Sequence, residues 1–250
     1  MGKRLLASAL FAGLLAGLVS AALQHWMTTP LILQAELYES GEMVHGAAHA
    51  HDGAHAHEGG HDHGAVGAAA SGHAHDHDHG DEVGLTERAA NTFMMTLVAM
   101  AGFGLLLTAG FALAERLGAG RVGLREGLMW GAAGFACTQL LTGAGLPPEL
   151  PGSAAAPLLE RQIWWTLTAL LSAAGLAVLA WAPNPARWLG LALLALPHAI
   201  GAPHPEELWG GAPPELAGLF VARSLLIGAV GWTVLGAAAG WLWSDERRAA

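Results

Sequence analysis

Long uncharged stretches alternate along this chain with short segments that carry most of its charges. Five stretches contain no Asp, Glu, Lys or Arg, and they cover residues 5–34, 89–114, 127–148, 162–186 and 224–244. Each provides the roughly 20 residues that an apolar α-helix needs to cross a hydrocarbon core. A sixth apolar stretch, residues 188–202, is shorter and contains Pro197.

The composition agrees with this pattern. Of the 250 residues, 53% are hydrophobic and 12% are charged, whereas soluble domains carry about 25% charged residues. We therefore predict an all-α protein, a polytopic transmembrane helical bundle of about six spans. The first span lies within residues 1–37, and the other five are expected near residues 89–114, 126–146, 162–183, 187–202 and 216–243.

The N-terminal sequence MGKRLLASALFAGLLAGLVSAALQHW also has features of a secretory signal, namely two basic residues, an apolar run and the small residues VSAA. Its uncharged run is longer than the about 7–15 residues usual in such a signal, which favours an uncleaved first span.

The basic residues predict the orientation. With the N-terminus inside, only Arg88 and Arg161 fall at outer helix ends, and this asymmetry places both termini in the cytoplasm. The residues on the cytoplasmic side are then Lys3, Arg4, Arg116, Arg121, Arg125, Arg187, Arg247 and Arg248.

Tryptophans at the predicted helix ends are expected to be interfacial anchors. They are Trp26, Trp164 and Trp165 outside, and Trp181, Trp188, Trp241 and Trp243 inside.

Small residues inside the spans predict close helix contacts. Gly13/Gly17, Gly127/Gly131 and Gly236/Gly240 each have the four-residue spacing that lets two backbones approach. Cys137 is the only cysteine, so no intrachain disulfide can form, and its place in an apolar stretch indicates a buried thiol.

Residues 38–88 form a predicted outer loop that holds eleven of the fourteen histidines. These are His45, His49, His51, His55, His57, His61, His63, His73, His75, His77 and His79. Few large apolar residues occur there, so the loop is expected to be disordered when free. Ten of its histidines form H-x-H pairs among acidic residues, a ligand set that suits Co, Ni, Zn or Cu(II). A solvated spacer and a loop that charges below about pH 6.5 are the alternatives.

Five polar residues near the membrane are tentative members of a transport pathway: His25, His198, His204, Arg161 and Arg223. His198 and His204 lie in LPHAIGAPHP, where we expect the short fifth helix to break at Pro197 and expose backbone carbonyls to a cavity. Interfacial histidines beside ordinary loop prolines are the alternative.

Two outer loops, GLPPELPG and GAPPELAG, are alike, as in a duplicated helical hairpin, and each is followed by an arginine, Arg161 or Arg223. Arg223 lies roughly 12 Å into the last span at about 1.5 Å per residue, where a charge needs a partner. Its candidate partners are Glu149, Glu160 and Glu215. A structural clamp and a transport role both fit this position.

The residues resemble a known family, the probable cobalt transporter subunit (CbtA) family of prokaryotic membrane proteins. The similarity is carried by WMTTPLILQAE, by GLPPELPG followed by RQIWW, and by LPHAIGAPHP followed by PPELAGLFVARSL. It implies an inner-membrane protein of five or six spans that serves cobalt supply for cobalamin, often beside a small His-containing partner protein. It transfers no catalytic residue.

The leading hypothesis is transport of a transition metal, most readily cobalt and otherwise nickel, with the His-rich loop capturing the ion. A membrane metal chaperone or sensor, and metal efflux, are the alternatives. The chain has no P-loop, no H-E-x-x-H and no G-x-S-x-G motif, which argues against an enzyme. The scattered basic residues argue against a nucleic-acid partner. We expect no permanently bound cofactor, only the captured or transported divalent metal (Co, alternatively Ni or Zn), and the lipid bilayer as surroundings.

Overall fold

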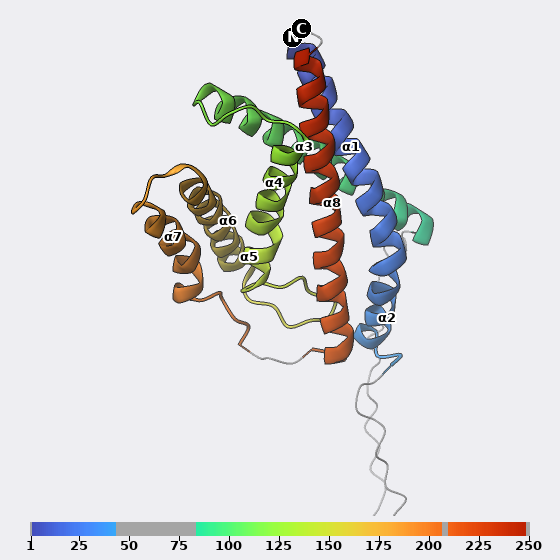
Figure 1. Ribbon diagram of the computed structural model, residues 1–250. Coiled ribbons are helices and arrows are strands. Elements are labelled where there is room, and N and C mark those ends of the chain that lie inside the picture. The colour runs from blue at the N-terminus through green and yellow to red at the C-terminus, as the bar shows by residue number, and fades with distance from the viewer. Residues whose placement is uncertain (1, 44–83, 207–209, 249–250) are drawn as a thin grey trace, which may run out of the picture.

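The structure is a computed structural model of the chain, and it describes residues 2–43, 84–206 and 210–248 (Figure 1). All regular structure in this part is helical, so the predicted all-α class is confirmed. The helices are α1 (Gly2–Met27), α2 (Thr29–Glu39), α3 (Leu85–Arg116), α4 (Leu124–Phe135), the π-helical segment η1 (Ala136–Leu140), α5 (Leu141–Gly143), α6 (Leu158–Trp181), α7 (Arg187–Ile200) and α8 (Pro214–Arg248).

Four helices are long and apolar enough to cross a membrane, and they coincide with the first, second, fourth and sixth predicted spans. They are Leu6–Met27, Thr86–Arg116, Leu158–Trp181 and Pro214–Asp245. The third predicted span falls on α4, η1 and α5, where the π-helical turn interrupts the α-helix. The fifth falls on α7, which has 14 residues and is about 21 Å long at 1.5 Å per residue. A core of about 30 Å is thicker than that.

The first predicted span, residues 1–37, is divided at Thr28. Pro30 has no N–H, which removes one helical hydrogen bond. The amides of Leu31 and Ile32 both bond to the Thr28 carbonyl, at 3.0 Å each. The Met27 carbonyl is therefore left without the amide of Leu31 as its helical partner, and α1 ends there.

The expected break at Pro197 is wrong. Proline lies in the last turn of α7, where it is buried, and the helix continues to Ile200. The proline removes one hydrogen bond from the helix, yet the last turn is closed by the Gly201 amide, which donates to the Pro197 carbonyl at 3.0 Å. The chain leaves at Gly201, whose φ of 91° is in the range that glycine alone adopts readily.

The termini lie at one end of the bundle, here called the terminal end, and α2 with the loops before α6 and α8 lies at the opposite loop end (Figure 1). Helices α1, α3 and α4 pack against α8. The hairpin of α6 and α7 stands to one side and touches the rest mainly through α4, η1 and α5.

The predicted glycine contacts are confirmed, and two of the three pairs meet each other. A Cβ on Gly127 of α4 would stand 2.7 Å from the Cα of Gly240 on α8. One on Gly236 would stand 2.9 Å from the Cα of Gly131. Gly13 of α1 packs in the same way on Ala101 of α3, at 2.5 Å from its Cα. No larger residue fits these positions without separating the helices.

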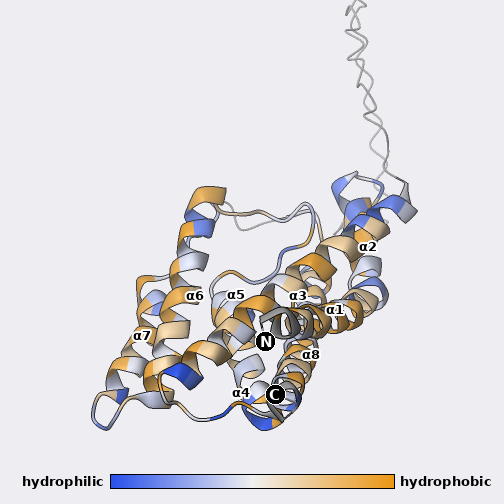
Figure 2. Cartoon of the chain, turned by 90° about the horizontal axis from the view of Figure 1, so that it is seen from above, coloured by the Kyte–Doolittle hydropathy of each residue, from blue (hydrophilic) through white to orange (hydrophobic). Residues whose placement is uncertain are grey.

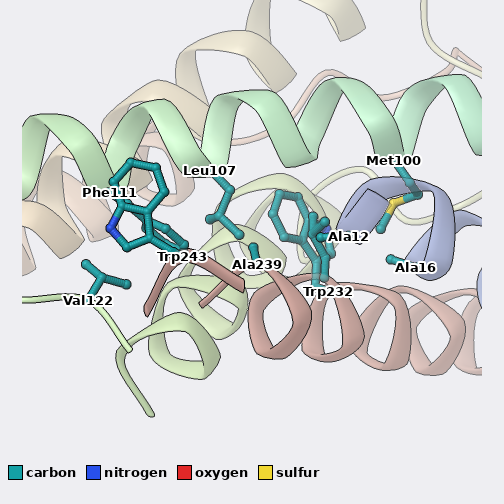
Figure 3. Packing of buried hydrophobic residues seen from close by; sticks show 10 residues of the cluster. Ala12, Ala16, Met100, Leu107, Phe111, Val122, Trp232, Ala239 and Trp243 are labelled. Carbon is teal, nitrogen blue, oxygen red and sulfur yellow. The ribbon is translucent and has the colours of Figure 1, made fainter. Parts of the chain in front are cut away.

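The terminal half of the bundle is closed by a cluster of apolar side chains (Figure 3). Its buried members are Ala12, Ala16, Met100, Leu107, Phe111, Val122, Trp232, Leu235, Ala239 and Trp243. Phe111 packs edge-on against Trp243, with ring centroids 5.8 Å apart. The indole of Trp243 donates to Glu115 at 3.2 Å, so its one polar atom is satisfied.

Two predicted interfacial anchors are corrected by this packing. Trp243 is 6% exposed and Trp164 is 8% exposed, because the first fills the core and the second lies over Gly145. The remaining predicted anchors, Trp26, Trp165, Trp181, Trp188 and Trp241, are exposed. Cys137 is buried, as expected.

Many large apolar side chains on the helices are exposed, and hydrophobic residues make up much of each long helix (Figure 2). Leu106 and Leu170 are 69% and 62% exposed, respectively. A surface of this kind is unstable in water and suits a lipid environment. With the four long apolar helices, it identifies an integral membrane protein.

Candidate functional site

A cavity of 1880 Å³ opens in the loop-end half of the bundle. Its walls come from the end of α1 with α2, the first turns of α3 and α6, the segment from η1 to Glu149, and the first half of α8. Its polar lining includes Ser20, Gln24, His25, Asn91, Thr96, Gln139, Thr142 and Gln162. Polar side chains at membrane depth are costly unless they line a cavity or have partners, so this cavity is the candidate functional site.

The closed end of the cavity meets the apolar cluster. Met100 and Trp232 belong to both. Phe103 also lines the cavity, and its ring packs on Trp232 with centroids 4.9 Å apart. The cavity therefore stops about half-way along α8, where its lining ends at Trp232.

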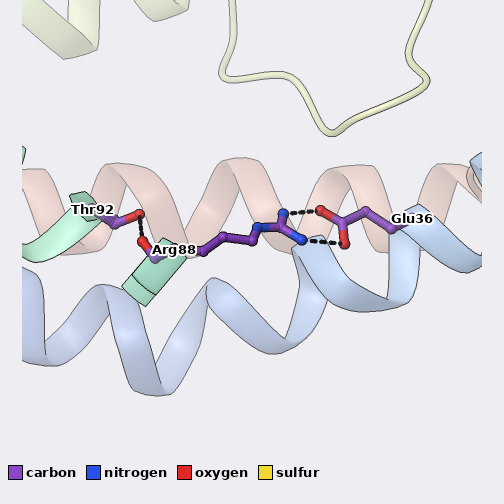
Figure 4. A network of polar contacts seen from close by, with 3 residues as sticks. All are labelled: Glu36, Arg88 and Thr92. Atoms are coloured by element: carbon purple, nitrogen blue, oxygen red, sulfur yellow. Dashed lines mark hydrogen bonds and ion pairs between the residues drawn. The ribbon is translucent and has the colours of Figure 1, made fainter. Parts of the chain in front are cut away.

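Two arginines on the cavity wall are each balanced by a carboxylate. Arg88 at the start of α3 pairs with Glu36 of α2 through both guanidinium nitrogens, one bond measuring 3.1 Å (Figure 4). Arg161 in the first turn of α6 lies 2.8 Å from Glu149 in the preceding loop. These pairs are partly exposed, so each contributes little to the stability of the fold. Their main effect is electrostatic, because a pair carries no net charge.

Arg223 has a different partner from the carboxylates that the sequence suggested. Its Nη1 donates to the carbonyl of Met27 at 2.8 Å, and Glu149 is taken by Arg161. The reason is the break at Thr28, which frees the Met27 carbonyl from its helical amide donor. Arg223 thus joins α8 to the junction of α1 and α2, as a structural clamp would.

The predicted pathway residues are only partly brought together. His25 and Arg161 lie on the cavity wall. His198 is exposed on α7 with its ring edge-on to Trp164 at 5.9 Å, and His204 is exposed in the following loop. Neither contributes to the cavity lining. In the described part of the chain, no three His, Cys, Asp or Glu residues form a group that could hold a metal ion.

The eleven histidines of the predicted outer loop, His45 to His79, lie outside the described residues. The described chain stops at Met43, just after α2, and resumes at Gly84, just before α3. The Glu36–Arg88 pair connects these two helices near the cavity.

The uncharged polar residues of the cavity were missed by prediction from sequence. Gln24, Thr96 and Gln139 each lie in a stretch without charge, whereas the predicted site residues were all histidines and arginines. A glutamine within a span is itself a signal, because its amide needs a partner in hydrocarbon. Thr96 supplies one such partner by donating to the Gln24 amide oxygen at 2.8 Å.

Comparison with known proteins gives one family. Residues 2–244 match the model of the family described as Probable cobalt transporter subunit (CbtA). No curated protein and no solved structure matches the chain. Since the match spans nearly the whole sequence and agrees with a bundle of long apolar helices, this chain belongs to the probable cobalt transporter subunit (CbtA) family.

Proposed function

We propose that this chain carries a divalent transition metal, Co²⁺ first and Ni²⁺ second, across the prokaryotic cytoplasmic membrane and into the cell. The observation that supports this most directly is the cavity, which carries polar side chains on a largely apolar wall and ends at an apolar cluster. A transporter requires a site within the bundle that is reached from one side of the membrane at a time. The family description adds cobalt as the substrate.

The orientation in this proposal follows the basic residues. The terminal end, with Lys3, Arg4, Arg247 and Arg248, faces the cytoplasm under the positive-inside rule. The cavity then opens to the outside, and the His-rich segment begins and ends on that side. An ion bound by its imidazoles is released next to the mouth, where His25 lies on the wall. His198 and His204 remain proposed ligands on a separate path along α7.

The balanced arginines are compatible with a cation as substrate. Unpaired, Arg88 and Arg161 would repel a divalent ion at the mouth. Paired with Glu36 and Glu149, they contribute little long-range repulsion. Capture of the ion is thereby left to the histidines, whose neutral form is a good ligand for cobalt and nickel.

A partner completes the proposal. The family description calls its members subunits, which implies a transport complex. The chain contains no P-loop, so energy comes from an ion gradient, the membrane potential or a partner protein. A small His-containing membrane protein is the partner that the family resemblance suggests. No catalytic step is part of this function.

Uptake of radioactive cobalt and nickel into cells with and without the chain tests the proposal. Import predicts higher accumulation with the chain, and efflux predicts lower accumulation. Unchanged accumulation together with metal binding by the purified protein would favour a chaperone or sensor. Deletion of residues 45–80 should lower uptake when cobalt is scarce and leave it nearly intact when cobalt is abundant. Loss of uptake at saturating cobalt would instead make the segment part of the conduction path.

A further inference from the structure

Two polar side chains at the closed end of the cavity lie directly on glycines of α8. A Cβ on Gly228 would overlap the side-chain amide of Gln139, and a Cβ on Gly231 would overlap the hydroxyl of Ser20. These glycines are three residues apart, so they share one face of the helix about one turn apart. The absence of side chains on α8 therefore creates the space that Gln139 and Ser20 occupy.

Neither polar group has a hydrogen-bond partner among the described residues. The hydroxyls of Thr108, Thr138 and Thr142 each donate to the carbonyl four residues earlier. Those of Thr168 and Ser172 on α6 also lack a partner among the described residues, but these two residues do not line the cavity. Ser20 and Gln139 both line the cavity and have their hydrogen-bonding capacity free. In an apolar bundle an unpaired amide costs free energy, so a polar ligand that enters from the cavity would stabilise this arrangement.

The π-helical segment places Gln139 at this position. Residues 136–140 form a wider turn than the α-helices on either side, and such turns often occur at functional sites. A π-turn shifts the residues after it around the helix axis, so α4 can face Gly236 and Gly240 with its glycines while Gln139 faces Gly228.

The ligands available here are neutral. They are a hydroxyl, an amide and, from Met100, a thioether whose methyl carbon lies 3.5 Å from the Cβ position of Gly231. Glu149 is the only carboxylate among the described residues of the cavity lining, and it belongs to the ion pair with Arg161. Neutral donors bind the water shell of a divalent ion weakly, which suits a site that must release its ion quickly.

We propose that Ser20 and Gln139, seated on Gly228 and Gly231, form a transit site that holds a partly hydrated divalent cation at the closed end of the cavity. This inference rests on the proposed function, because it names where the transported ion pauses. The site lies next to Trp232, so the ion that occupies it is in contact with the apolar cluster that has to open for passage.

Cobalt uptake by cells that express the full chain tests this site, with the amount of membrane-inserted protein measured for each variant. Gln139→Leu should lower the maximal rate of uptake about tenfold. This is the effect expected when the passing ion loses the stabilisation of one hydrogen bond. Ser20→Ala should lower it about threefold on the same reasoning. Gln34→Leu makes the same change at an exposed position of α2 outside the cavity lining and should leave the rate unchanged.

Gln139→Glu keeps the shape of the side chain and adds a charge. It tests the transit site even if the leucine variant does not accumulate in the membrane. It should lower both the half-saturating cobalt concentration and the maximal rate, because a carboxylate holds the ion longer. Parental kinetics for the glutamate variant would overturn the transit site while leaving transport itself in place. Absence of cobalt uptake by the parental chain would overturn the proposed function instead, so the two failures are distinguishable.

Discussion

The two halves of α8 use glycine for opposite purposes. In the terminal half, Gly236 and Gly240 contact the backbone of α4, and the helices close together without a gap. In the loop-end half, Gly228 and Gly231 contact the polar side chains of Gln139 and Ser20, and a cavity lies beside them. The residue type and the helix are the same in both halves. What differs is the element that approaches the glycine, and this decides whether a region is a seal or a pathway.

The largest expected effect comes from placing a side chain in the glycine contact between α4 and α8. Gly127→Leu puts a side chain where the Cα of Gly240 stands 2.7 Å from the Cβ position, so α4 and α8 must separate. Overpacking of this kind costs about 3 kcal/mol or more, and the variant should fail to accumulate in the membrane or melt far below the parental protein in detergent.

Gly102→Leu is the matched control for that substitution. It changes a glycine of α3 that has open space around it, and its melting temperature should stay near the parental value. Equal losses in both variants would mean that helix propensity, and not the contact between α4 and α8, governs the result.

A smaller effect, which compares the two halves of the bundle more directly, is expected for the access of water to each half. In a Cys137→Ala background, a cysteine at Gln24 on the cavity wall should react with a hydrophilic maleimide, whereas one at Ala16 should not. The two positions lie on α1, and Ala16 is fully buried in the apolar cluster. The rate of labelling is the measurement. Similar rates at both positions would show that the terminal half also admits water, and the comparison of seal and pathway would fail.

The smallest of these effects is expected for the clamp at the loop end. Arg223→Gln weakens the charged hydrogen bond to the Met27 carbonyl, which is worth about 1.5–3 kcal/mol. The melting temperature in detergent should fall by about 5 °C, given about 2–4 °C per kcal/mol for a chain of this size.

Arg161→Gln serves as the comparison, since it removes an arginine from the same half of the bundle. Its pair with Glu149 is partly exposed, and the expected loss is about 0–1 kcal/mol. A larger fall for Arg161→Gln than for Arg223→Gln would contradict the assignment of Arg223 as the clamp.

The sequence by itself determined the helical class, the positions of the apolar segments and the glycine spacings. These follow from local properties, because a run of some twenty uncharged apolar residues can satisfy its backbone only as a helix in lipid. The family was also recognisable from short motifs, and the match over residues 2–244 confirms it. The His-rich segment was equally visible in the sequence, and its role in metal capture stays a prediction.

Tertiary structure alone decided which of these segments touch and what the polar residues do. Trp164 and Trp243 occur at helix ends, as anchors do, but packing buries them. Helix α7 does not break at Pro197. The proline lies in the last turn, and the helix loses a single hydrogen bond there. Arg223 bonds to none of its candidate glutamates, because the Met27 carbonyl, left free where α1 ends at the Thr28 break, lies within its reach. Gln139 and Ser20 are far apart in sequence, and both lie against α8 because it has glycines where they meet it. Such contacts depend on distances between segments, which local sequence patterns do not encode.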